Sequence, residues 1–179
     1  MTVWVALLRA VNVSGVNPLP MAGFRTMLAD LGLSAAKTYI QTGNAVFRSD
    51  LAGPALSAGI ADGVLARFGF RPPVFVIDRG AFQATLDANP FPQVEEPTHL
   101  HALFMERALP DAGFAFLNAL AAEGEAFALR GRVLWLHLPQ GFGRSPLAKR
   151  VMALPVDITA RNLRSVRAIA DLAQSLGPG

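Results

Sequence analysis

Short apolar runs and helix-type patterns follow one another along the first eighty residues. Residues 3–8 are apolar at every position, which is typical of a central strand covered on both faces. From Pro20 to Gly32 the apolar residues recur at spacings of three and four, which predicts an amphipathic helix bounded by the proline and the glycine. Residues 38–41 and 45–48 then predict a hairpin.

A second helix and a closing strand complete this pattern. Pro54 can open a helix in which Leu56, Ile60 and Val64 lie one turn apart, and Gly69 ends it. Residues 74–77 predict the closing strand. The element order βαββαβ is that of the ferredoxin-like split motif.

The same order recurs in the second half of the chain. Residues 79–88 predict a linker helix, and residues 89–98 contain three prolines and two acidic residues, a composition typical of a loop. A strand over residues 100–105 is followed by a helix from Pro110 with Phe114, Leu117 and Leu120 on its apolar side. A hairpin over residues 126–129 and 133–138 and helices over residues 146–153 and 162–176 follow, without an obvious closing strand.

We therefore predict an α/β fold, an α+β sandwich of two ferredoxin-like βαββα(β) halves. The N-terminal subdomain covers residues 1–78, the linker helix and Pro-rich loop cover residues 79–98, and the C-terminal α/β subdomain covers residues 99–179.

The composition narrows the class of protein. A hydrophobic fraction of 52% over 179 residues is ample for a packed core. The absence of cysteine excludes disulfides, a thiolate nucleophile and cysteine-based metal sites. No apolar run approaches the about 18 residues needed to cross a bilayer, and the N-terminal run lacks a preceding basic region. We expect a cytoplasmic protein that has no membrane partner.

Charge is distributed unevenly along the chain. The formal net charge is +3, but the residues from Arg130 onward carry eight Lys and Arg against two Asp. That C-terminal third is therefore at +6, and residues 1–129 are at −3. Such a field attracts phosphate-bearing partners such as nucleic acid or a phosphorylated small molecule, although a solvated basic face gives the same pattern.

Polar groups gather in three loops beside predicted helix starts and in one hairpin turn. A helix start presents unpaired N–H groups and a partial positive charge, and therefore favours anions. Asn12, Asn17 and Asn44 could instead satisfy turn backbone, and Ser145 could simply cap a helix. The candidate anion-binding residues are Arg9, Asn12 and Asn17 in the first loop, Tyr39, Gln41 and Asn44 in the hairpin, Arg144 and Ser145 in the second loop, and Arg161 and Asn162 in the third.

Metal and nucleophile chemistry have weaker support. His99 and His101 lie two apart on a predicted strand, and His137 could lie on a neighbouring strand. Three histidines without a carboxylate at ligand spacing are more often structural, so no metal and no cofactor are predicted. No GxSxG elbow is present, and the glycines near Arg144 match neither a phosphate-loop nor a full GxGxxG signature.

These loops also carry a resemblance to a known family. The chain resembles the bacterial family called domain of unknown function 1697 over essentially its whole length, and the resemblance implies a two-subdomain ferredoxin-like fold with no established activity. The matching segments are Ala-Leu-Leu-Arg-Ala-Val-Asn-Val at residues 6–13, Thr-Tyr-Ile-Gln-Thr-Gly-Asn-Ala-Val-Phe at 38–47, Asn-Pro-Phe-Pro at 89–92, Gly-Arg-Ser at 143–145 and Thr-Ala-Arg-Asn at 159–162.

The chain departs from that family's usual pattern at five positions. Ala10 and Ser14 stand where the family has glycines, Thr42 where it has serine, and Pro146 where it often has lysine. Leu163 replaces a tryptophan, which removes an aromatic surface that could stack on a base near the last helix.

Three functional hypotheses follow from these residues. The first is an anion-binding module for nucleic acid or a nucleotide, which depends on Arg9, Arg144 and Arg161 lying on one surface. The second is an enzyme acting on a small anionic metabolite in a cleft between the halves, for which no catalytic motif is present. The third is a protein-interaction scaffold whose polar loops are structural.

Overall fold

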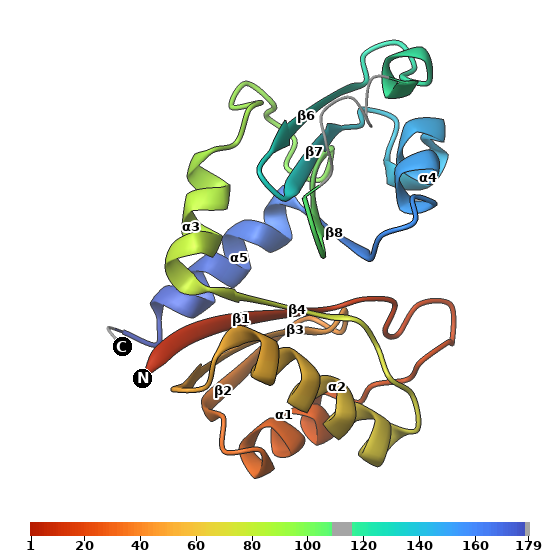
Figure 1. Ribbon diagram of the computed structural model, residues 1–179. Helices are drawn as coiled ribbons and strands as arrows, with labels where there is room; N and C mark the ends of the chain where they lie inside the picture. Colours follow the sequence, from red (N-terminus) through yellow and green to blue (C-terminus); the bar gives the residue numbers. More distant parts are fainter. Residues whose placement is uncertain (109–115, 178–179) are drawn as a thin grey trace. The chain divides into compact units, whose positions relative to one another are not determined.

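Strand β1 (Thr2–Leu8) lies at the centre of a four-stranded antiparallel sheet in the computed structural model, which describes residues 1–108 and 116–177 (Figure 1). Strands β3 (Asn44–Ser49) and β4 (Val74–Asp78) pair with β1 on either side. Strand β2 (Ser34–Tyr39) pairs with the outer edge of β3, so the strand order is β2-β3-β1-β4. This order confirms the predicted ferredoxin-like motif.

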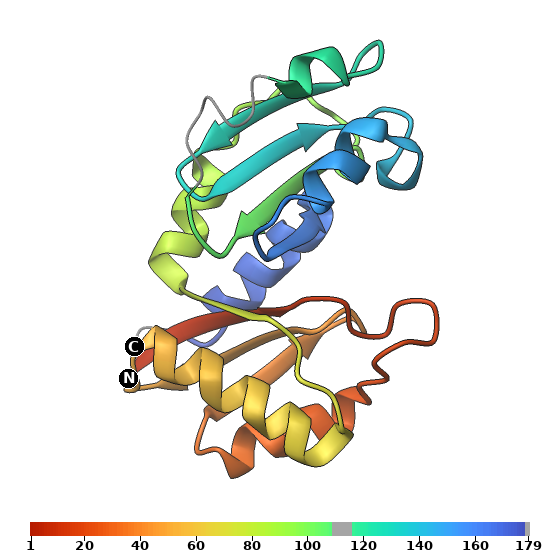
Figure 2. The ribbon, with the colours of Figure 1, turned by 45° about the vertical axis from the view of Figure 1, so that its right-hand side comes forward.

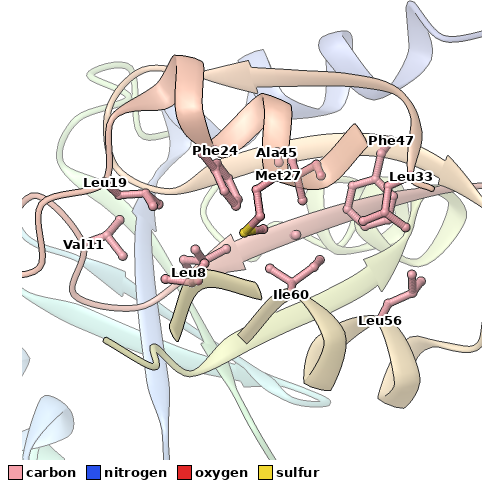
Figure 3. Close-up of a cluster of buried hydrophobic side chains, with 13 residues drawn as sticks. Leu8, Val11, Leu19, Phe24, Met27, Leu33, Ala45, Phe47, Leu56 and Ile60 are labelled. Carbon is pink, nitrogen blue, oxygen red and sulfur yellow. The ribbon is translucent and has the colours of Figure 1, made fainter. Parts of the chain in front are cut away.

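Two helices cover one face of this sheet (Figure 2). Helix α1 (Met21–Asp30) begins directly after Pro20, and helix α2 (Gly53–Phe68) ends at Gly69, whose left-handed backbone conformation provides the C-cap. Because side chains alternate along a strand, every second residue of β1 points towards these helices. Figure 3 shows the resulting core, which includes Leu8, Val11, Leu19, Phe24, Met27, Leu33, Ala45, Phe47, Leu56 and Ile60.

The opposite face of the same sheet is also apolar and buried. Val3, Val5, Leu7 and Val46 are all below 4% exposure, which explains why the run over residues 3–8 shows no alternation. Helix α5 (Leu163–Gln174) ends on this side of the sheet (Figures 1 and 2).

The chain divides into two compact units, and two helices have residues in both of them. The first unit consists of Met1–Ala84 together with the chain from Arg167 onward, and the second consists of Thr85–Val166. Helix α3 (Arg79–Asp87) leaves the first unit for the second, and α5 returns from the second to the first. The last helix therefore belongs in part to the N-terminal fold.

The second unit contains a sheet with the same strand order as the first. Strands β5 (Leu100–Met105), β6 (Ala126–Arg130), β7 (Val133–His137) and β8 (Ile158–Asn162) form an antiparallel sheet in the order β6-β7-β5-β8. Strand β5 takes the central place that β1 takes in the first sheet. The predicted repeat is confirmed.

Strand β8 supplies the closing strand that the hydrophobic pattern did not predict. Its residues alternate between apolar and polar, but Thr159 and Arg161 on its polar side are buried as well as Ile158 on its apolar side. A five-residue strand that ends in arginine and asparagine resembles a loop before a helix when only its sequence is read.

Helix α4 (Pro146–Met152) packs on one face of the second sheet. Leu147, Ala148 and Val151 point into a core with Leu103 and Leu134 from the strands. The helix predicted from Pro110 falls partly outside the described residues. Within them, residues 116–119 form a turn of 3-10 helix, and Leu117 is buried in the same core.

Candidate functional site

Two loops that carry candidate residues lie against each other in the first unit. They are the loop of residues 9–19, after β1, and the turn of residues 40–43, between β2 and β3. The side-chain Nδ2 of Asn12 donates to the carbonyl oxygens of Gln41 at 2.7 Å and Leu19 at 2.9 Å, and its Oδ1 accepts from the Leu19 N–H at 2.7 Å. Asn12 therefore fastens the two loops together.

Gly43 makes this contact possible because no side chain fits at its position. A Cβ atom there would lie 2.6 Å from Cγ2 of Val11 and 2.8 Å from Cβ of Leu8. Its φ of +73° is also in the left-handed region that favours glycine. The N–H of Leu8 donates to the Gly43 carbonyl at 2.8 Å, so the turn is held to the end of β1.

The candidate asparagines of these loops hydrogen-bond to their own surroundings. Asn17 Nδ2 donates to the carbonyl oxygen of Ala10 at 2.9 Å. Asn44 is fully buried and donates to the Tyr39 carbonyl and to Oγ1 of Thr42. These contacts are those of turn-stabilising residues. Of the candidates of this unit, only Asn44 is buried; Gln41 is exposed, and Arg9, Asn12, Asn17 and Tyr39 are partly exposed.

Backbone strain is concentrated in the same two loops. Among the described residues, six non-glycine residues have a positive φ, and five of them lie here: Ala10, Asn12, Ser14, Asn17 and Ile40. A β-branched residue such as isoleucine is the most strained of these types, at about 1–3 kcal/mol. The loops also expose Val13 at 54%, Val16 at 60% and Ile40 at 49%. The two loops are therefore strained, and they expose apolar side chains to solvent.

In the second unit, Ser145 acts as the N-cap of α4. Its Oγ accepts a hydrogen bond from the N–H of Ala148 at 3.0 Å, and the residue is buried. Arg144 precedes it in a short 3-10 helix, η2 (Phe142–Arg144), and is exposed. Capping therefore accounts for Ser145 but not for Arg144.

Arg161 lies in strand β8, not at a helix start as the sequence suggested. It pairs with Ala102 of β5, and its side chain points to the face opposite α4, because Ile158 and Ala160 face the α4 core. The guanidinium donates to Oγ1 of Thr159 and to the Ala160 carbonyl, both at 2.8 Å. Burial lowers the pKa of Arg161 to about 10, which leaves it charged at neutral pH.

The second sheet thus separates Arg161 from the segment that carries Arg144. The neighbouring candidate, Asn162, accepts a hydrogen bond from the Ser165 N–H at 2.9 Å and so caps α5. Leu163 is buried, so the position where the family has tryptophan faces the interior.

Charge in the second unit differs from the charge of the C-terminal third. Thr85–Val166 contains eight Lys and Arg and eight Asp and Glu, so its formal charge is zero. The charges are nevertheless segregated, because residues 126–156 contain five cations and no acidic residue. All five are exposed, and none forms an ion pair with a carboxylate in the part of the chain that the structure describes; they are Arg130, Arg132, Arg144, Lys149 and Arg150.

Three of these cations and one aromatic ring define a surface that we call the α4 basic face. It consists of Arg144, Lys149, Arg150 and Phe116. The guanidinium of Arg150 lies 5.6 Å from the centre of the Phe116 ring, which is a cation–π contact, and Phe116 is 40% exposed. Sequence reasoning included Arg144 only. The acid-free stretch of residues 126–156 is the signal that could have identified Lys149 and Arg150.

The histidines do not share a face. His101 packs on the α4 side against Phe142, with ring centres 4.9 Å apart, whereas His137 contacts Phe91 on the other side of the sheet. The register explains this separation, because the partner of His101 on β7 is Leu136. No group of three His, Asp or Glu side chains suited to a metal ion occurs among residues 1–108 and 116–177.

Burial affects the protonation of His101. It lowers the pKa of the imidazole to about 4, and the imidazole Nδ1 has no hydrogen-bond partner among the residues that the structure describes. In the described helices, no segment has the length and apolar character needed to cross a membrane.

Comparison with known proteins establishes the family. The family model described as Protein of unknown function (DUF1697) matches residues 1–135, and the chain belongs to this family. The fold is similar to that of the conserved bacterial protein SP0830 from Streptococcus pneumoniae, with a TM-score of 0.77 and 23% identity over 96% of this chain and 98% of that chain. No curated protein matches the chain. The resemblance inferred from the sequence is confirmed.

The close approach at Gly43 predicts a large effect of one added methyl group. We expect Gly43→Ala to lower the free energy of unfolding by about 2–3 kcal/mol, because the methyl group would overlap Leu8 and Val11 and strain the backbone. Gly59→Ala, in the middle of α2 with open space around it, should instead raise stability by about 0.5–1 kcal/mol. Urea denaturation measures both. Equal effects of the two changes would contradict the packing described here.

Burial of His101 predicts a loss of stability in mild acid. The folded-state pKa of about 4 lies below the unfolded value of about 6.5, so the unfolded chain binds the proton first as the pH falls. We expect a loss of about 2 kcal/mol between pH 7 and pH 5. His101→Leu should remove most of it, and His99→Gln should retain it. A wild-type stability that is constant over this interval would refute the assignment.

Proposed function

We propose that the second unit binds single-stranded nucleic acid through the α4 basic face. The observation that carries this proposal is the combination of five exposed cations, none of them in an ion pair with a carboxylate of the described residues, and no acidic residue over residues 126–156, inside a unit whose formal charge is zero. Because the unit as a whole is neutral, its acidic residues lie in parts of its sequence other than this stretch of five cations. Clustering of Lys and Arg on one face is the electrostatic footprint of nucleic-acid binding.

Cations elsewhere in the chain contrast with those of this face. Arg67 contacts Asp30 at 2.6 Å, Arg71 contacts Asp62 at 2.9 Å, and Arg164 lies 3.6 Å from Glu96. Three exposed arginines outside residues 126–156 thus contact a carboxylate, whereas none of the five cations within that stretch does so among the described residues. Arg144, Lys149 and Arg150 are exposed and form no ion pair with a carboxylate of residues 1–108 or 116–177.

The shape of the face favours a polymer over a small ligand. Small-molecule sites are concave and bury most of their ligand. Lys149 and Arg150 lie on the exposed side of α4, whose buried side is formed by Leu147, Ala148 and Val151, and the exposed Arg144 precedes the helix. Contacts to successive phosphates of a chain suit such an open surface.

Phe116 favours a single strand over a duplex. Unpaired bases present their flat faces to aromatic side chains, and such stacking is tolerant of base identity. The Arg150 guanidinium lies over the Phe116 ring, and Phe116 is 40% exposed, so part of the ring is accessible to a base beside that guanidinium.

Salt dependence tests the phosphate contacts. Fluorescence anisotropy measures the affinity of the wild-type protein for a fluorescein-labelled single-stranded oligonucleotide at several salt concentrations. We expect log affinity plotted against log salt concentration to have a slope of about −2, because three phosphate contacts are made. The triple variant Arg144→Gln, Lys149→Gln, Arg150→Gln should bind at least tenfold more weakly and have a slope near zero. Phe116→Ala should weaken binding about fivefold and leave the slope unchanged, because it removes stacking and no charge.

A matched variant controls for net charge. The triple variant Arg25→Gln, Arg67→Gln, Arg71→Gln removes the same number of positive charges, but from the first unit. It should retain wild-type binding. Equal losses in the two triple variants would reduce the effect to overall charge and contradict the proposed face. Wild-type binding whose affinity does not change with salt concentration would also contradict the proposed face.

A further inference from the structure

Three basic side chains converge on the C-terminal end of α5. Lys37 Nζ lies 3.1 Å from Oγ of Ser175, and Nη1 of Arg79 donates to the Gly177 carbonyl at 2.5 Å. Nη2 of Arg48 donates to the carbonyl of Leu176. All the groups involved belong to the first unit.

The register of the first sheet brings these cations to one face. Lys37 on β2 is the partner of Val46 on β3, and Arg48 lies two residues beyond Val46, so both side chains emerge from the same side. That side is opposite α1 and α2, because Phe47 points into their core. Arg79 is the first residue of α3, directly after β4.

The described groups that contact one another here carry an excess of positive charge. A helix C-terminus carries about half a negative charge, whereas Lys37, Arg48 and Arg79 carry three positive charges. Each guanidinium has five N–H donors in a fork that suits oxyanions, and one contact to a carbonyl leaves others available.

The acidic residues nearest along the chain are Asp50, Asp78 and Asp171, and Asp171 is exposed on α5, one turn before Ser175. Asp50 accepts the N-terminal ammonium of Met1 at 3.3 Å, and Asp78 accepts the backbone N–H of Ala81 at 2.9 Å. No ion pair joins Lys37, Arg48 or Arg79 to a carboxylate within residues 1–108 and 116–177.

We propose that Lys37, Arg48 and Arg79 form a binding site for a small multivalent oxyanion, a phosphate or phosphate monoester. The anion would bridge the three cations, compensate the charge that the helix end leaves, and fasten the last turn of α5 to the first sheet. This site is separate from the α4 basic face, because it lies in the other unit and takes a single anionic group.

Inorganic phosphate is the first probe. Compared with sodium chloride at the same ionic strength, it should raise the thermal midpoint of the wild type by several degrees, and above the dissociation constant the shift should grow with the logarithm of the phosphate concentration. At a phosphate concentration ten times the dissociation constant, amide hydrogen exchange limited by opening of residues 172–177 should slow about tenfold. Glycerol 3-phosphate in parallel distinguishes a phosphate ester from free phosphate, and stabilisation by either compound beyond that of chloride at the same ionic strength supports the site.

Two triple variants assign the effect to one site. Lys37→Gln, Arg48→Gln, Arg79→Gln should lose the phosphate-dependent shift and keep nucleic-acid binding. The α4 variant Arg144→Gln, Lys149→Gln, Arg150→Gln should show the opposite behaviour, so failure of one proposal is distinguishable from failure of the other.

Several results would overturn the proposal. One is a phosphate effect no larger than that of chloride, and another is a shift that survives in the Lys37, Arg48, Arg79 variant. If that variant does not fold, the single change Lys37→Gln at an exposed position should weaken phosphate binding about three- to tenfold. Unchanged phosphate affinity in this single variant would also reject the site.

Discussion

Burial of the central strand on both faces is the constraint on which the first unit depends. Helices α1 and α2 cover only one side of β1, and a strand that is apolar at every position needs a second cover. The chain meets this need with a helix that begins directly after β8 and ends in the first unit. The hydrogen bonds from Lys37, Arg48 and Arg79 to Ser175, Leu176 and Gly177 then hold the chain just after α5 to the first unit.

The fold could be predicted from the sequence because its signals are local. The unbroken apolar run of β1, the spacing of apolar residues in α1 and α2, and the repetition of that order all lie within short windows. Strand β8 was missed because its polar residues are buried by tertiary packing, which no local pattern records. The return of α5 to the first unit depends on contacts with residues more than a hundred positions earlier.

The candidate site was harder to predict because charge balance is a property of three-dimensional units. The C-terminal third is strongly basic as a stretch of sequence, yet the second unit is neutral because acidic residues from earlier in the chain belong to it. Arg144 was identified from its loop, and Arg161 proved to be a buried strand residue. Phe116 joins Arg150 only in space, since 34 positions separate them.

The shared helix also determines where this protein can be divided. The match to the family model ends at residue 135, within β7, before α4, β8 and α5. A fragment cut there would lack the closing strand of one sheet and the second cover of the other. An excised piece limited to residues 1–84 would expose an aliphatic sheet surface of the kind that promotes self-association. Dissection into independently folding parts therefore requires the terminal helix to be supplied to the N-terminal part, for example by circular permutation.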